Sequence, residues 1–116
     1  MADNDAAWQI GFYEDRRGRS PVVEFMNRLP AKDRAKINNA LRLLENYGTA
    51  LGMPHARPIE GRLWELRPGG VRLFYFVYTS RQFVLLHGYR KQSQKAPDRE
   101  IALAKRRMEE LLEEIE

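Results

Sequence analysis

Two arginines beside a glycine turn are the residues of this sequence best suited to chemistry on a phosphate ester. Arg67 ends the apolar segment that starts at Leu63, and Arg72 follows a Pro-Gly-Gly turn at the start of the next apolar segment. A guanidinium stays charged, and its forked N–H groups match two phosphate oxygens. Glu65 lies two residues before Arg67, which places both on one face of an extended chain. These residues predict a phosphate-binding site that also holds a carboxylate.

Three further candidates, His87, Tyr89 and Lys91, alternate along a later apolar segment. If this segment is a strand, alternation places His87 and Tyr89 on one face together with Phe83 and Leu85, and Lys91 joins that face if the strand extends. We therefore expect the basic and aromatic candidates to converge at one end of a sheet, with Glu65 beside them: Arg67, Arg72, His87, Tyr89 and Lys91.

Such a set suits the metal-free cleavage of RNA, in which a 2′-hydroxyl attacks the neighbouring phosphorus. The reaction needs a base for the hydroxyl proton, cations for the charge that grows on the phosphate, and an acid for the leaving oxygen. Arginine suits the cationic role, and one preorganised donor typically contributes about 3 kcal/mol. The base and acid roles stay open among the titratable candidates Glu65, His87, Tyr89 and Lys91.

Several of these residues also have ordinary structural or binding roles. His87 could be a hydrogen-bonded histidine of the sheet, and Glu65 could simply pair with a neighbouring arginine. Tyr89 could stack on a displaced base. Arg90 and Lys95, which follow it closely, are expected to contact the RNA backbone.

Charge distribution favours a polyanionic partner. Between residues 55 and 99 there are nine Lys and Arg but only three acidic residues, a net +6, whereas the whole chain carries +4. Basic charge on a sheet with aromatic residues between is typical of nucleic-acid binding. The chain has no cysteine and only two histidines, which excludes disulfides and argues against a zinc site. We expect no metal and no cofactor.

No apolar run approaches the roughly 20 residues of a membrane span. The acidic N-terminal sequence has neither a basic start nor a long apolar segment, so no signal peptide is expected. The sequence therefore predicts a cytoplasmic protein that has no membrane partner.

The order of predicted elements indicates an α+β fold. Ser20 and Pro21 are typical of a helix start, Gly48 of a helix end, and the run 71–78 is apolar on both faces, as in a central strand. We predict one domain over residues 1–116, with a small antiparallel or mixed sheet, an N-terminal helical hairpin and a C-terminal helix. The predicted strands cover residues 7–13, 58–60, 63–67, 71–78 and 82–89, and the helices cover 21–28, 30–48 and the segment from Pro97 onward.

Four stretches of the sequence carry a family resemblance. They are LWELR at 63–67, VRLFYFV at 71–77, LLHGYRKQSQKAPDREIALAKRR at 85–107, and the helical segment VVEFMNRLPAKDRAKINNALRLLENYG. On these residues the sequence resembles the RelE/ParE toxin superfamily, and within it the phage-derived HigB-like toxins of type II toxin–antitoxin systems. The resemblance extends from Phe12 to Arg107.

The resemblance implies a RelE-like, microbial-RNase-like fold and an mRNA interferase that cuts mRNA on the ribosome. It also implies a cognate antitoxin, commonly a helix-turn-helix DNA-binding protein in this branch. By motif, Arg67, Arg72 and Lys91 take catalytic positions. RelE-type members carry paired lysines where this sequence has Leu63 and Glu65, so the base is unassigned between Glu65 and His87.

Two alternatives follow from the same resemblance. The ParE branch of the superfamily inhibits DNA gyrase by protein binding and has no RNase chemistry. A catalytically degenerate module that binds only its antitoxin is the other alternative, because fold alone does not determine activity.

Overall fold

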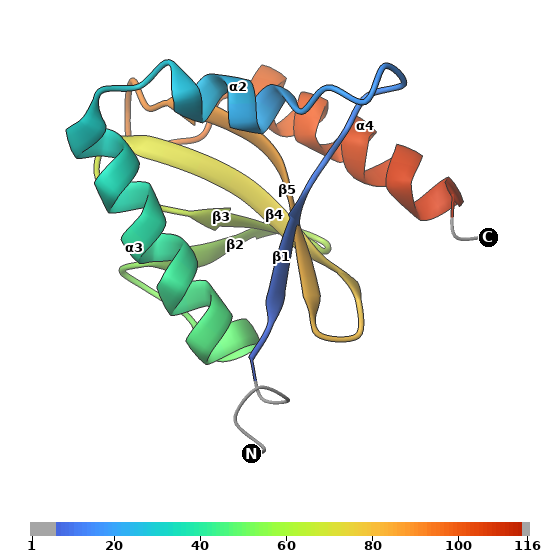
Figure 1. Ribbon diagram of the computed structural model, residues 1–116, viewed down its shortest axis with the longest axis horizontal. Coiled ribbons are helices and arrows are strands. Elements are labelled where there is room, and N and C mark those ends of the chain that lie inside the picture. The colour runs from blue at the N-terminus through green and yellow to red at the C-terminus, as the bar shows by residue number, and fades with distance from the viewer. Residues whose placement is uncertain (1–6, 115–116) are drawn as a thin grey trace.

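A five-stranded mixed sheet forms the centre of the computed structural model, which describes residues 7–114 (Figure 1). The strand order is β1-β5-β4-β3-β2; β1 runs parallel to β5, and the other neighbours are antiparallel. This architecture confirms the predicted α+β fold class. In chain order the elements are β1 Gln9–Phe12, α2 Pro21–Asn27, α3 Ala31–Tyr47, the 3-10 helix η1 Gly48–Ala50, β2 Ala56–Glu60, β3 Leu63–Leu66, β4 Val71–Thr79, β5 Gln82–Arg90 and α4 Asp98–Glu114.

The helical hairpin begins and ends where local signals predicted. The Ser20 side chain accepts a hydrogen bond from the amide of Val23, and Pro21 occupies the first turn of α2. Gly48 ends α3 with a φ of 57°. A β-carbon at Gly48 would lie 2.1 Å from the indole nitrogen of Trp8, so both backbone conformation and space require glycine there.

Two apolar layers cover the two faces of the sheet. The helices α2 and α3 pack on one face through residues such as Val22, Ile37 and Leu44. The helix α4 packs on the other face through Ala104 and Met108. Strand β4 contributes alternate residues to both layers, Leu73 and Tyr75 to the first and Phe74 and Phe76 to the second, as its two-sided apolar sequence predicted.

A β-bulge in β5 changes which residues share a face. Phe74 is the partner of His87, but the next residue of β4, Tyr75, is the partner of Leu85, so Leu86 is the extra residue. Phe83 and Leu85 therefore face α2 and α3, whereas Tyr89 packs in the layer under α4. The expectation that His87 and Tyr89 share a face with Phe83 and Leu85 was wrong, because the bulge inserts one residue into the alternation.

Smaller differences concern strand ends. Strand β1 covers only part of the predicted segment 7–13, and β2 begins at Ala56, two residues before the predicted start. Among residues 7–114, no helix combines the length and the apolar character that crossing a membrane requires.

Candidate functional site

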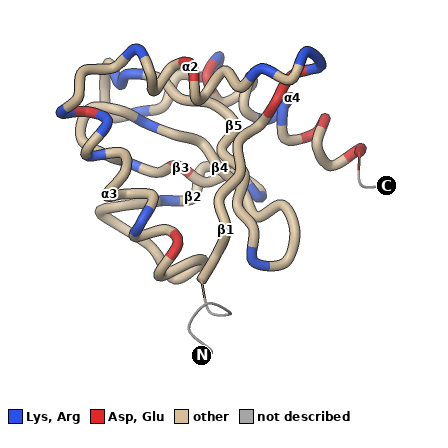
Figure 2. The backbone as a smooth tube through the Cα atoms, viewed as in Figure 1, with Lys and Arg blue, Asp and Glu red and all other residues tan. Residues whose placement is uncertain are grey.

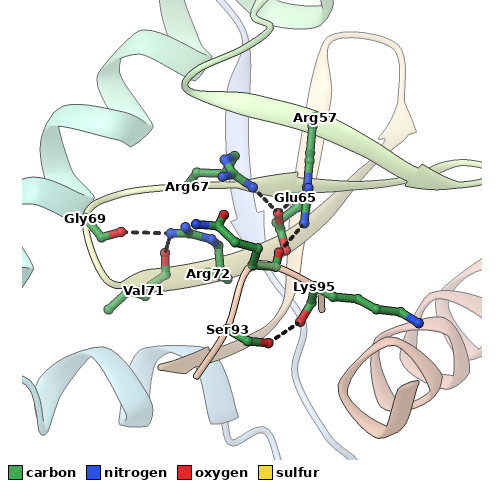
Figure 3. Close-up of polar contacts among 9 residues, drawn as sticks. Arg57, Glu65, Arg67, Gly69, Val71, Arg72, Ser93 and Lys95 are labelled. Atoms are coloured by element: carbon green, nitrogen blue, oxygen red, sulfur yellow. Dashed lines mark hydrogen bonds and ion pairs between the residues drawn. The ribbon is translucent and has the colours of Figure 1, made fainter. Parts of the chain in front are cut away.

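A buried carboxylate held by two arginines forms the centre of the candidate site. Glu65 in β3 is 1% exposed. Its Oε1 accepts hydrogen bonds from Nε of Arg57 at 2.8 Å and from Nη1 of Arg67 at 2.9 Å (Figure 3). Its other oxygen, Oε2, is buried and has no hydrogen-bond partner within the described chain. As alternation predicted, Trp64 and Leu66 lie in the opposite layer of the core.

Arg72 is a second buried cation beside this group. It is 6% exposed, and its Nη1 donates to the carbonyl oxygens of Gly69 and Val71, each at 2.8 Å (Figure 3). It forms no ion pair with any of residues 7–114. Burial lowers the pKa of Arg72, and the nearby charge of Arg67 lowers this pKa further. The charge of Glu65 offsets these effects only in part, and a buried cation that has no ion pair favours the approach of an anion.

His87 forms a short hydrogen bond with the first turn of α4. The distance between Nε2 of His87 and Oε1 of Glu100 is 2.5 Å. Burial lowers the pKa of His87 and outweighs the opposite effect of Glu100. The imidazole is therefore neutral near pH 7, and when Nε2–H donates to Glu100, Nδ1 is left as an acceptor. The ring packs against both Phe74 and Tyr89, at centroid distances of 6.4 and 6.0 Å, and these two rings lie 5.6 Å from each other.

Tyr89 lies directly opposite Arg72 in the sheet. The phenol is 8% exposed, and burial, together with the charge of Glu65, raises the pKa of Tyr89 to about 12. Tyr89 therefore keeps its proton at neutral pH and is able to donate a hydrogen bond to an anion.

The structure brings some of the predicted residues together and separates others. Arg67, Arg72, His87 and Tyr89 lie with Glu65 on the α4 face of the sheet. Arg90 instead pairs with Asp33 of α3 at 3.0 Å, on the other side. The exposed side chain of Lys95 extends away from Glu65 (Figure 3).

Lys91 is partly exposed, and its backbone N–H donates to the carbonyl of Gly70 at 2.9 Å. This bond places Lys91 next to the turn that Arg72 holds. Its predicted catalytic role, like the predicted roles of the other residues, stays a prediction.

The loop between β5 and α4 covers the arginine group. Nη2 of Arg57 donates to the carbonyl oxygen of Gln94 at 3.1 Å. Ala96 is 5% exposed and packs in the same apolar layer as Tyr89. The sequence predicted a basic pocket, whereas the structure shows a cluster under a loop, with Arg57 and Arg67 as its more accessible cations.

Two residues of this site were not predicted from the sequence. Arg57 lies one residue before the predicted strand 58–60 and was given no role in the site; in the structure it is the partner of Glu65 in the neighbouring strand. Glu100 lies in the helix predicted from Pro97 onward and was also given no role in the site, although an acid on the helix that directly follows the histidine strand is a signal for such a pair.

Within residues 7–114, no group of three or more His, Asp or Glu side chains is placed to hold a metal ion. The cations that could meet a phosphate in this arrangement are guanidinium groups. Together, two arginines, a neutral imidazole tied to a carboxylate and a protonated phenol are able to bind a phosphate and transfer protons beside it.

The fold and these residues define a small α+β domain with a basic cluster on its mixed sheet. The chain belongs to the family described as phage derived protein Gp49-like, whose model matches residues 24–109. Its structure is similar to a chain in the crystal structure of the toxin–antitoxin complex RelBE2 from Mycobacterium tuberculosis, with a TM-score of 0.54 and 16% identity over 73% of this chain and 99% of that chain. No curated protein matches the sequence.

Proposed function

We propose that this protein is the HigB-like toxin of a type II toxin–antitoxin system, and that it is a metal-independent endoribonuclease that cuts mRNA on the ribosome. The observation that carries this proposal is Arg72, a buried cation without a carboxylate partner in the described chain, next to Arg67 and the His87–Glu100 pair. The RelE-like fold and the phage-derived family support it.

In the proposed reaction, the 2′-hydroxyl oxygen forms a bond to phosphorus while the bond to the 5′-oxygen breaks. Nδ1 of His87 takes the hydroxyl proton, and Glu100 orients the ring through Nε2. Arg72 and Arg67 bind the non-bridging oxygens as negative charge grows there. Tyr89 or Lys91 returns a proton to the leaving 5′-oxygen. The products are a 2′,3′-cyclic phosphate and a 5′-hydroxyl end.

Glu65 fits a positioning role better than the role of base. Its Oε1 already accepts from two guanidinium groups, and its Oε2 is enclosed. The carboxylate therefore holds Arg57 and Arg67 in place and offsets part of their mutual repulsion.

Access to Arg72 requires the loop over the site to move. Within the described residues, the hydrogen bond from the Arg57 side chain to the Gln94 carbonyl connects this loop to the arginine group. An RNA phosphate is a stronger acceptor for Arg57 than a neutral carbonyl, because both partners are charged. Substrate binding therefore replaces this bond and exposes the cluster.

The test is inducible expression in a bacterium, with transcript 5′ ends mapped and DNA supercoiling measured in parallel. We expect growth arrest and new 5′ ends in phase with codons. Arg106→Ala, which removes an exposed arginine of α4, is the control that keeps full toxicity. Intact mRNA with trapped gyrase–DNA complexes would support the ParE-like alternative, and unimpaired growth would support a degenerate module.

The same proposal includes a cognate antitoxin, because the related solved fold comes from a toxin–antitoxin complex. We expect a small helix-turn-helix DNA-binding protein encoded beside the toxin gene. Co-expression should relieve growth arrest and give one co-eluting complex. Separate elution with continued arrest would contradict this assignment.

A further inference from the structure

A basic groove lies on the α3 side of the β3–β4 turn. It has a volume of about 230 Å³, and none of its described lining residues is acidic. Figure 2 shows mainly basic positions along α3, whereas acidic positions gather near the C-terminal end of α4. The polar residues that line the groove are Lys36, Asn39, His55 and Arg67, and Ala40 and Leu43 form an apolar wall.

Lys36 extends across the glycine turn. A β-carbon built on Gly69 would lie 2.9 Å from Cδ and 3.4 Å from Nζ of Lys36, and Gly69 has a φ of 58°. The absence of a β-carbon at Gly69 leaves room for the Lys36 side chain beside the turn. Neither Lys36 nor His55 forms an ion pair with any of residues 7–114. Both are exposed and able to donate hydrogen bonds to a ligand.

Arg67 connects this groove to the candidate catalytic site. Its backbone N–H donates to the carbonyl oxygen of His55 at 2.9 Å. Arg67 also lines the groove, while Nη1 of its side chain donates to Glu65 on the α4 face of the sheet. An RNA strand that passes around the β3–β4 turn would therefore reach both the groove and the cluster that contains Arg72.

We propose that this groove binds a backbone phosphate of the RNA strand next to the scissile bond, through Lys36, His55 and Arg67. The inference rests on the proposed function and adds the path of the substrate. Lys36 and His55, which form no ion pair within the described residues, and Arg67, which shares Glu65 with Arg57, provide N–H donors for a phosphodiester. The apolar wall of Ala40 and Leu43 offers contact to the attached ribose or base. The basic side chain of Lys36 and the absence of an acid among the described lining residues favour an anionic strand over an apolar peptide segment.

The test uses the double variant Lys36→Gln/His55→Gln and the control Lys32→Gln, which removes the same charge from an exposed position of α3 outside the groove. The probe is a fluorescent single-stranded RNA with 2′-O-methyl riboses, which binds but has no free hydroxyl for cleavage. For the double variant we expect affinity lower by about tenfold, and a salt slope of log K reduced by about 0.7 for each lost phosphate contact. The control should keep the affinity and slope of the unchanged protein. Equal affinity and slope in the double variant would overturn the proposal.

A cleavable RNA separates this inference from the proposed function. We expect the double variant to show a raised KM and an unchanged kcat, since the groove does not touch the reacting atoms. If the protein cleaves RNA but the double variant binds it unchanged, the groove is not an RNA site and the nuclease proposal stands. If the double variant binds RNA more weakly but the unchanged protein does not cleave it, the groove is an RNA site and the nuclease proposal is wrong. Loss of antitoxin binding alone, with RNA binding intact, would overturn the groove's assignment to RNA.

Discussion

Nη1 of Arg107 donates to the carbonyl oxygen of Leu86 at 2.9 Å, so the C-terminal helix satisfies the backbone of the bulged residue in β5. The same guanidinium lies over the ring of Tyr13, 5.2 Å from its centroid. Because the bulge turns His87 and Tyr89 toward the α4 face, Arg107 positions the site without belonging to it.

Replacing Arg107 should therefore weaken both the fold and the proposed activity. Arg107→Met leaves the Leu86 carbonyl without its partner, which should cost about 1–3 kcal/mol of unfolding free energy. Denaturant unfolding and amide exchange at residues 85–89 measure the effect. Arg106→Met, at an exposed position one residue earlier, is the control and should change little. Unchanged exchange in Arg107→Met would show that the bulge does not depend on this bond.

Arg72→Ala should lower RNA cleavage by about 10²–10³-fold, because it removes a preorganised donor from the proposed transition state. Since Arg72 also holds two carbonyls of the β3–β4 turn, thermal unfolding should be measured for the same variant. Arg106→Ala serves as the exposed control. A folded Arg72→Ala protein with full activity would exclude Arg72 from the site.

Two matched amide substitutions distinguish the candidates for the base. His87→Gln should reduce kcat by about 10²–10⁴-fold, the usual size of a general-base contribution. Glu65→Gln keeps an acceptor oxygen for both arginines and should retain activity. The opposite ranking of the two variants would assign the base to Glu65.

The lowered pKa of His87 predicts a pH dependence of stability. The folded protein binds a proton at His87 less tightly than the unfolded chain, in which histidine titrates near 6.5. The stability that the neutral, buried His87 contributes to folding is therefore fully present above about pH 6.5, and it declines as the pH falls below that value. Unfolding free energies from pH 8 to pH 5 should fall more steeply for the unchanged protein than for His87→Gln. Parallel curves would contradict the shift.

Metal removal should leave activity unchanged, because the proposed cations are arginines of the chain. EDTA-treated protein at high concentration should cleave a model RNA. Ribosomes are left out of this assay because they need magnesium, which EDTA would remove. Activity that disappears with chelator and returns with one specific metal would indicate metal-ion catalysis instead.

Local patterns were sufficient to predict the strands that hold Glu65 and Arg72, and the place of Arg67 directly after the first of them. Alternation of side chains and one glycine turn fix their faces, and both signals lie within ten residues. The positions of His87 and Tyr89 could not be predicted in the same way, because they depend on a bulge whose carbonyl is bonded to Arg107, 21 residues away. The loop over the site and the bond to Glu100 likewise depend on where α4 packs.

The parallel pairing of β1 with β5 places the first and last strands of the chain side by side. Such distant pairings form late, since long loops must close before the contact stabilises anything. The bulge that orients His87 also requires residue 107, close to the end of the described chain. In a growing polypeptide the proposed site would therefore form only after α4 has been synthesised as far as residue 107 and has packed on the sheet.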